Sequence, residues 1–95
     1  MSVYVDEIKK YETNLKYKMW CHLLTDGKDM ELHLMAEKIG LQRKWFQSKS
    51  VPHYDLTPNK RKLAIKNGAI TLDFEEMKRF VRLNYGKLRK KRVKG

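Results

Sequence analysis

The sequence has few of the residues that cross-link chains or break them: one cysteine, two prolines and five glycines in 95 residues. Because Cys21 is alone, it cannot form an internal disulfide, and we expect a reducing compartment. No run of about 18 apolar residues occurs, which excludes a membrane-spanning helix. The first residues also lack the basic start and apolar stretch of a secretory signal. These absences predict a cytoplasmic protein with no membrane span.

The size of the chain predicts one domain. Hydrophobic residues make up 41% of it and include two Trp, five Tyr, three Phe and five Met, which is enough for one compact core. A domain this small buries only roughly 60% of its unfolded surface. A homodimer that buries more surface therefore also fits the composition.

Positive charge dominates, with 22 basic against 11 acidic residues and a net charge of +11. We divide the chain into a domain, 1–86, and a basic tail, 87–95. The tail holds six basic residues and no acidic one: Lys87, Arg89, Lys90, Lys91, Arg92 and Lys94. Clustered cations gain affinity for phosphate polyanions by releasing counterions, so nucleic acid is the expected partner. A solubilising tail, or one that touches anionic lipid, is the alternative.

The apolar patterning predicts strands at 3–5 and 19–25, a helix over 28–39, a brief strand at 45–46, a helix over 58–67 and a strand at 69–72. Residues 6–18 are expected to form a loop or helical turn, and 47–52 an exposed loop. A third helix begins at 74 and fades into the tail near 85–86. This alternation predicts a single small α/β domain, in which a short mixed sheet packs with about three helices.

Local signals mark the helix ends. Asp26 is a candidate N-cap of the first helix, and Gly40 fits the left-handed residue that closes it. Thr57-Pro58 is typical of a helix start, and Asp73 with Glu76 forms a capping-box pair for the third helix. The apolar face of the first helix is Leu32, Met35, Ala36 and Ile39, and that of the third is Phe74, Met77, Phe80 and Val81.

The three histidines are the candidate chemistry. His22 lies in the second strand, His33 on the first helix, and His53 begins the triplet His53-Tyr54-Asp55. Three imidazoles and a carboxylate can ligate a divalent metal, or supply a general acid and base for a phosphodiester. In an extended triplet, His53 and Asp55 point the same way and Tyr54 points opposite. Their spacing matches no zinc signature, and the alternative is a core His22, a solvated His33 and an Asp55 that orders a turn.

Two basic segments could meet nucleic acid. Arg43 and Lys44 precede Trp45-Phe46, and aromatic rings beside cations can stack on bases, although core packing is the alternative. Lys60, Arg61 and Lys62 form the first turn of the second helix, where their charge opposes the helix dipole. Phosphate contact, aided by the anion-binding helix N-terminus, or plain solvation explains them.

The motifs together resemble a family of small proteins of unknown function found in bacteria and tailed phages. They are His22-Leu23-Leu24-Thr25-Asp26, Glu31-Leu32-His33 with Ala36 and Gly40, Trp45-Phe46, His53-Tyr54-Asp55, Lys60-Arg61 with Ala64 and Gly68-Ala69, and the opening Val3-Tyr4-Val5-Asp6. The resemblance covers roughly residues 1–72 and leaves out the third helix and the tail. It implies no known activity, but it implies a shared polar site, because motif positions are occupied by His22, Asp26, Glu31, His33, His53, Tyr54 and Asp55. Cys21 does not belong to the pattern.

Three hypotheses of function remain. The first is a nucleic-acid-binding protein that uses the tail and the basic turn; a phage origin is one of the two that the resemblance allows. The second is a small phosphoesterase or nuclease that uses the histidines and Asp55, with a divalent metal as a candidate cofactor. The third is an inhibitor or adaptor that binds a host protein.

Overall fold

The computed structural model describes residues 2–10, 18–48 and 51–94, with side chains described as far as residue 85. Its elements in chain order are β1 (Val3–Val5), β2 (Lys9–Lys10), β3 (Met19–Thr25), α1 (Asp29–Lys38), the 3-10 helix η1 (Arg43–Trp45), β4 (Tyr54–Leu56), α2 (Pro58–Lys66), β5 (Ile70–Thr71) and α3 (Phe74–Lys94). Within these ranges, no helix is long and apolar enough to cross a membrane.

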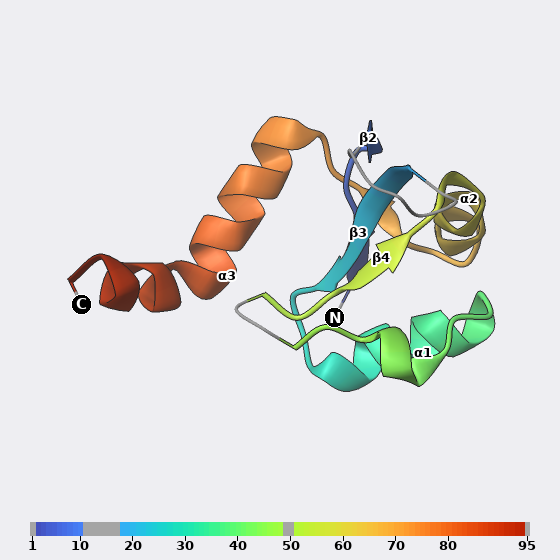
Figure 1. Ribbon diagram of the computed structural model, residues 1–95, viewed down its shortest axis with the longest axis horizontal. Helices are drawn as coiled ribbons and strands as arrows, with labels where there is room; N and C mark the ends of the chain where they lie inside the picture. The colour runs from blue at the N-terminus through green and yellow to red at the C-terminus, as the bar shows by residue number, and fades with distance from the viewer. Residues whose placement is uncertain (1, 11–17, 49–50, 95) are drawn as a thin grey trace.

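Strand β3 is the centre of the sheet (Figure 1). It pairs antiparallel with β1 and β2 along one edge and with β4 along the other. Strand β5 pairs parallel with β1, so the sheet is mixed. The predicted single α/β domain, with a short mixed sheet and three α-helices, is confirmed.

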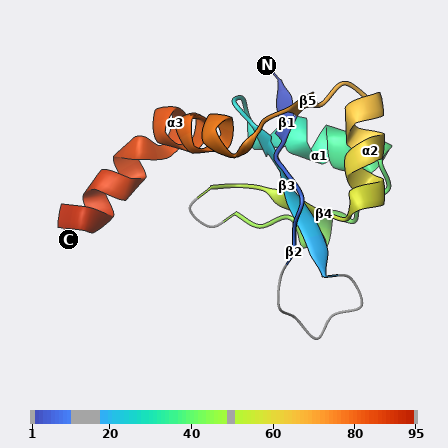
Figure 2. The same ribbon diagram turned by 90° about the horizontal axis from the view of Figure 1, so that it is seen from above.

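The helices lie on both sides of this sheet (Figure 2). Helices α1 and α2 contact β3 and β1 and enclose the main core. That core contains the predicted face of α1, since Leu32, Met35, Ala36 and Ile39 are all buried. Helix α3 approaches from the other side, where the rings of Tyr4 and Phe80 lie 5.0 Å apart. On the sheet face away from α1 and α2, Trp20 and His22 of β3 are only partly buried.

Strands β1 and β2 follow the same edge of β3, but their registers differ by one residue. Val5 lies opposite Leu23 and Lys9 opposite Trp20, so three residues on one side face two on the other. This is a β-bulge, which re-aims side chains and is common next to functional sites. The bulge begins at Asp6, whose backbone N–H donates to the His22 carbonyl at 3.3 Å.

Several predicted helix ends are confirmed. The Thr57 hydroxyl accepts the backbone N–H of Lys60 at the start of α2. Asp73 and Glu76 each accept the backbone N–H of the other at 2.8 Å, the reciprocal capping box expected for α3. Gly40 has a φ of +82°, the left-handed conformation that ends α1. These interactions involve residues close in sequence, which explains why local patterns predict them.

Other predictions were wrong. Asp26 is not the N-cap of α1, since Lys28 holds that position without a side-chain bond. The carboxylate of Asp26 instead accepts from the Ser2 backbone N–H at 2.9 Å and the Tyr4 hydroxyl at 3.1 Å. It therefore fastens β1 to the end of β3, a contact between residues more than 20 positions apart that no cap pattern reveals.

The expected strand at 45–46 is also wrong: Trp45 lies in η1, and the strand between α1 and α2 is β4. Strand β2 forms within the segment expected to be a loop or helical turn, while residues 11–17 lie outside the described part. Helix α3 does not fade near residues 85–86, because its backbone continues to Lys94. Of its predicted apolar face, Phe80 is buried, but Phe74 is 51% exposed.

Candidate functional site

The pairing of β3 with β4 brings His22, His53 and Asp55 together. His22 is the direct cross-strand partner of Asp55 in the antiparallel register. His53 lies two residues before Asp55, so its side chain projects from the same face. Tyr54, between them, points the other way and is fully buried. The two imidazoles meet edge to face, with ring centroids 5.1 Å apart.

The three side chains converge through specific atoms. Nε2 of His53 lies 3.4 Å from Oδ1 of Asp55, and Nε2 of His22 lies 4.0 Å from the same oxygen. Both histidines are partly exposed, at 32% for His22 and 20% for His53, and Asp55 is 38% exposed. The group is therefore held by the sheet but remains open to a ligand.

The other nitrogen of each imidazole is already occupied. Nδ1 of His22 lies 2.8 Å from Oδ2 of Asp6, and Nδ1 of His53 lies 2.8 Å from the Val51 carbonyl oxygen. A carboxylate and a carbonyl only accept hydrogen bonds, so Nδ1 must carry the proton in both neutral rings. The lone pair is then on Nε2, the atom that faces Asp55. Oxygen acceptors behind histidine ligands orient them in this way at metal centres.

Asp6 is fixed by contacts with two elements, β3 and α2. Its Oδ1 accepts the backbone N–H of His22 at 2.6 Å, in addition to the imidazole contact of Oδ2. Arg61, from α2, donates through Nε to the Asp6 carbonyl at 2.9 Å. At the bulge, the Asp6 carboxylate thus accepts the His22 backbone N–H in place of a backbone carbonyl of the neighbouring strand. Sequence reasoning missed Asp6, and the resembling Val3-Tyr4-Val5-Asp6 opening was the only signal that could have found it.

His53 and Gln47 affect the pKa and the orientation of the Asp55 carboxylate. When the His53 ring is protonated on both nitrogens, its Nε2–H donates to Asp55; this hydrogen bond lowers the pKa of Asp55, and burial opposes the shift. The same bond raises the pKa of His53, again against the effect of burial. The Gln47 amide donates to the second oxygen of Asp55 at 2.6 Å, which fixes the plane of the carboxylate. Gln47 was not predicted either, because an exposed glutamine in an expected loop carries no signal.

His33 is not part of this group. It lies on α1 with Nδ1 2.8 Å from the Tyr54 hydroxyl, and its ring packs edge to face on Phe46 at 4.6 Å. Burial, followed by the charge of Arg43, lowers the pKa of His33. The expectation that three histidines share one site is therefore corrected: two converge, while the third joins Tyr54 beneath the sheet.

The other predicted site residues are also spread out. Asp26 is engaged with Ser2 and Tyr4, as described above. Glu31 lies in the first turn of α1, where its negative charge favours the helix N-terminus. Burial raises the pKa of the Cys21 thiol to about 12, so it is protonated at neutral pH and is a poor nucleophile.

The donor set of His22, His53 and Asp55 fits a divalent transition metal. One ligand atom from each lies within 4.8 Å of the others, the one such group of at least three among the described residues. Zn²⁺ binds imidazole nitrogen and carboxylate oxygen at about 2.0–2.2 Å. Tetrahedral ligands at that bond length are about 3.4 Å apart, so the histidine–carboxylate distances need to contract by less than about 1 Å. Two imidazoles and one carboxylate leave a coordination position open for water or substrate.

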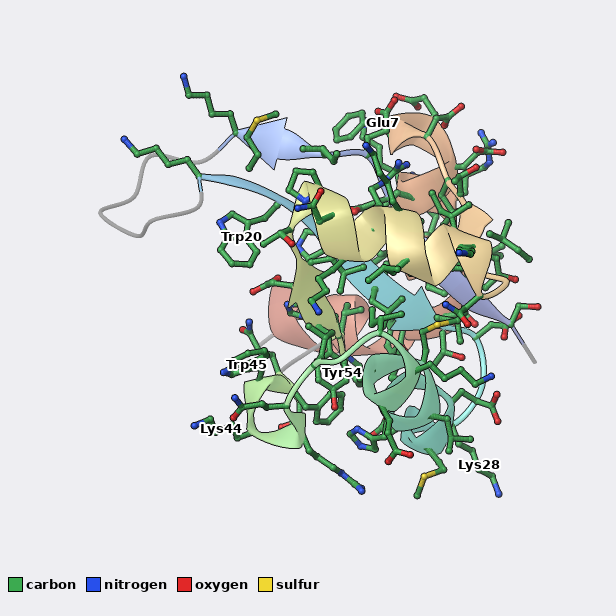
Figure 3. The ribbon with its side chains drawn as sticks, turned by 90° about the vertical axis from the view of Figure 1, so that its right-hand side faces the viewer. Glu7, Trp20, Lys28, Lys44, Trp45 and Tyr54 are labelled. Atoms are coloured by element: carbon green, nitrogen blue, oxygen red, sulfur yellow. The ribbon has the colours of Figure 1, made fainter. Side chains whose placement is uncertain are left out.

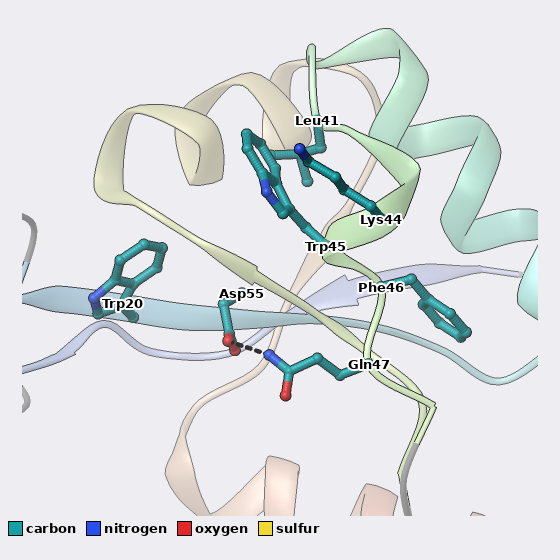
Figure 4. A pocket seen from close by; sticks show the side chains of 7 residues that line it. All are labelled: Trp20, Leu41, Lys44, Trp45, Phe46, Gln47 and Asp55. Atoms are coloured by element: carbon teal, nitrogen blue, oxygen red, sulfur yellow. Dashed lines mark hydrogen bonds between the residues drawn. The ribbon is translucent and has the colours of Figure 1, made fainter. Parts of the chain in front are cut away.

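A groove of about 530 Å³ opens beside these ligands (Figure 4). Its lining includes Trp20 from β3, Trp45 and Lys44 from η1, and the bonded pair Gln47 and Asp55. Trp20 and Trp45 lie on the same flank of the molecule, whereas Tyr54 lies between η1 and α1 (Figure 3). The groove therefore shares Asp55 with the histidine group.

The predicted nucleic-acid contacts divide into two kinds. Arg43, Lys44 and Lys62 are exposed. Lys60 donates through Nζ to the Ile39 carbonyl at 2.7 Å and so closes α1, while Arg61 binds Asp6. Their positive charge at the start of α2 thus has structural uses that the sequence did not suggest. The side chains of the six basic tail residues lie outside the described part.

A family model matches residues 3–84 of the chain. The family is described as a protein of unknown function (DUF4031). The chain belongs to this family. The match extends beyond the expected residues 1–72 and includes the first half of α3, so that helix is part of the DUF4031 pattern. No curated protein and no solved structure matches the chain.

Proposed function

We propose that this DUF4031 protein is a small metal-dependent phosphoesterase that acts on nucleic acid, with His22, His53 and Asp55 as metal ligands. The observation that carries the proposal is the orientation of the two imidazoles. Each has its Nδ1 bound to an oxygen acceptor and its Nε2 aimed at Asp55. A purely structural histidine needs one hydrogen bond and no such convergence.

The donor chemistry favours a hydrolytic metal centre. Three protein ligands and one open position are typical of catalytic zinc sites, and a histidine pair with a carboxylate is one of the standard ligand sets. The same set also holds Fe²⁺ in oxygenases. We assign phosphoester chemistry because a net charge of +11 favours a phosphate-bearing substrate.

The step is the addition of water across a phosphorus–oxygen bond. His22, His53 and Asp55 would hold a divalent ion, which would favour deprotonation of a water molecule and offset charge on the phosphoryl oxygens. Asp6 and Val51 keep both Nε2 atoms available, and Gln47 fixes the Asp55 carboxylate. The water oxygen bonds to phosphorus as the ester oxygen leaves, and the water proton returns to that leaving oxygen. Lys44 is exposed and lines the adjacent groove, and its positive charge supports the proposal of a phosphate-bearing substrate.

The hypothesis of nucleic-acid binding becomes the substrate side of this proposal. Phosphate contacts by Arg43, Lys44, Lys62 and the tail predict affinity that falls steeply with salt. Removal of residues 87–95 is expected to abolish most of the non-specific affinity. Gel shifts of a labelled oligonucleotide between 50 and 200 mM salt, roughly the range over which such contacts are lost, measure both effects.

Hydrolysis assays test the catalytic claim. Protein stripped with EDTA is supplied in turn with Zn²⁺, Mn²⁺ or Mg²⁺ and assayed on bis(p-nitrophenyl) phosphate and on a labelled oligonucleotide. We expect metal-dependent release of p-nitrophenolate from wild type and His33→Ala, and loss of activity in His22→Ala and His53→Ala.

Calorimetry separates binding from turnover, because it measures the metal itself. Metal bound by wild type without any hydrolysis contradicts the phosphoesterase claim but not the metal site. No metal binding, or equal binding by His22→Ala and wild type, contradicts the metal site itself.

A further inference from the structure

The groove between β3 and η1 is a second feature with chemistry of its own. It is lined by Trp20, Leu41, Lys44, Trp45, Phe46, Gln47 and Asp55. We infer that it binds an unpaired nucleobase of a single-stranded nucleic acid and so brings the neighbouring phosphodiester to the histidine group. This inference rests on the proposed function and names its substrate class.

The two indoles have the character of a stacking platform. Trp45 is 48% exposed and lies in η1, which contains no buried residue. Its neighbour Phe46 is partly buried against the main core, with its ring centroid 4.6 Å from that of His33 and 5.5 Å from that of Tyr54. Exposed tryptophan at the wall of a concave surface is typical of ligand sites rather than of core packing. The core alternative therefore describes Phe46 but not Trp45.

The second wall comes from Trp20, on the same sheet face as His22. Trp20 and His22 are two residues apart on β3, and so their side chains project from one face. Figure 4 shows the indoles of Trp20 and Trp45 reaching the same opening from different elements, with the Gln47–Asp55 pair beside them. A base that enters here lies next to a metal ligand, which is where its phosphodiester is needed.

The charge of the rim fits a nucleotide better than an apolar peptide. Lys44 lines the groove and Arg43, next to it, is exposed. Cations beside aromatic rings are the common arrangement for single strands, in which the backbone contacts the cations and successive bases stack on the rings. A base within a duplex is already stacked on both faces and has to be extruded to enter. The groove therefore favours single strands over duplexes.

Tryptophan fluorescence reports on this groove alone, because both tryptophans of the chain line it. We would titrate the full chain in EDTA and low salt with a 12-residue oligothymidylate, with an abasic 12-mer of equal phosphate count, and with a 12-base-pair duplex. Quenching and at least about fivefold tighter binding of oligothymidylate than of the abasic strand are expected, since each stacked base contributes that much or more. Oligouridylate and free thymidine monophosphate distinguish RNA and nucleotide from DNA as the source of the base.

A matched pair of variants separates stacking from charge. Trp45→Leu keeps an apolar side chain but removes the ring, and Phe74→Leu removes an equally exposed aromatic far along the chain on α3. Anisotropy of labelled oligothymidylate should show Trp45→Leu binding at least about fivefold more weakly, with Phe74→Leu unchanged. The affinity of Trp45→Leu for the abasic strand should match that of wild type.

The outcomes distinguish this inference from the proposed function. Equal affinity for oligothymidylate and abasic strands, preference for the duplex, or an unchanged Trp45→Leu overturns the groove assignment. Base-dependent binding in EDTA without metal-dependent hydrolysis overturns the phosphoesterase and leaves the groove. Hydrolysis of bis(p-nitrophenyl) phosphate without base-dependent binding overturns the groove assignment and leaves the phosphoesterase.

Discussion

Histidine side chains lie against both faces of the segment 53–55, but their environments differ. On one face, His53 and Asp55 meet His22 beside a groove and remain partly exposed. On the other, Tyr54 is fully buried and its hydroxyl binds His33. An imidazole on the first face has its Nε2 directed at a carboxylate, and an imidazole on the second is packed against aromatic rings.

This difference shows that residue type alone does not make a site. A strand alternates its side chains between faces, so adjacent residues of one motif can serve a ligand and a core. His22 and His53 have an oxygen acceptor behind them and a shared carboxylate in front. His33 has the Tyr54 hydroxyl as its partner, and among the described residues it belongs to no group of three potential metal ligands. The proposed function therefore depends on His22, His53 and Asp55 on the first face.

The largest expected effect comes from removing a ligand. His53→Ala or His22→Ala should weaken Zn²⁺ binding by at least about 100-fold, because a two-ligand site with a single imidazole remains. His33→Ala, which removes the same ring from the other face, should bind Zn²⁺ as wild type does. Isothermal titration calorimetry measures all three. Equal losses in the three variants would show that the two faces do not differ.

A smaller effect is expected from Asp6→Asn. The amide can donate to Nδ1 of His22, which moves the ring proton to Nε2 and removes the lone pair that faces Asp55. Loss of an oxygen acceptor behind a metal-binding histidine costs about 10–100-fold in metal affinity. Circular dichroism checks that the fold is retained. As a control, Asp26→Asn makes the same change in a carboxylate that binds Ser2 and Tyr4 instead of a histidine, and its metal affinity should equal that of wild type. Wild-type affinity in Asp6→Asn would contradict the positioning role of Asp6.

Tyr54→Phe probes the second face. It removes the hydroxyl that partners Nδ1 of His33 and should lower the free energy of unfolding by about 1 kcal/mol, the usual net value of such a hydrogen bond. Metal affinity should stay the same, because Tyr54 points away from His22. Urea denaturation gives the first quantity and calorimetry the second. A loss of metal binding with unchanged stability would reverse the assignment of the two faces.

The smallest effect is a difference in titration. In metal-free protein, the Asp55 carboxylate accepts a hydrogen bond from protonated His53 and so raises the pKa of His53 above 6.5, whereas burial lowers the pKa of His33 below 6.5. His53 thus contributes stability below pH 6.5 that is lost as pH rises through its folded-state pKa. His33 opposes folding as pH falls below 6.5. NMR titration of the ring protons should find His53 above His33, and the reverse order would contradict the assigned partners.

The sequence predicts well what depends on neighbours in the chain. The alternation of His53, Tyr54 and Asp55, the capping box at Asp73 and the Gly40 helix end all follow from short patterns. The convergence of His22 with Asp55 depends on the β3–β4 register. A strand was expected at 45–46, but the strand that lies between α1 and α2 is β4, which begins at Tyr54. Sequence patterns therefore supplied the residues but not the partners.

Asp6 shows the limit most clearly. Its role comes from a one-residue bulge between β1 and β2, and nothing in a short polar segment marks a bulge in advance. The uses of Lys60 and Arg61, which bind backbone carbonyls of Ile39 and Asp6, likewise depend on how α2 packs. Their charge alone suggested phosphate contact or plain solvation, and neither predicts these two carbonyl partners.

The most direct test of the central claim follows the ring nitrogens themselves. In ¹⁵N-labelled protein titrated with Zn²⁺, we expect the Nε2 resonances of His22 and His53 to move to metal-bound positions in one saturable step. Their Nδ1 atoms should stay protonated, and His33 should not change. Binding through Nδ1, or an equal response from His33, would contradict the assignment of His22, His53 and Asp55 as a metal centre.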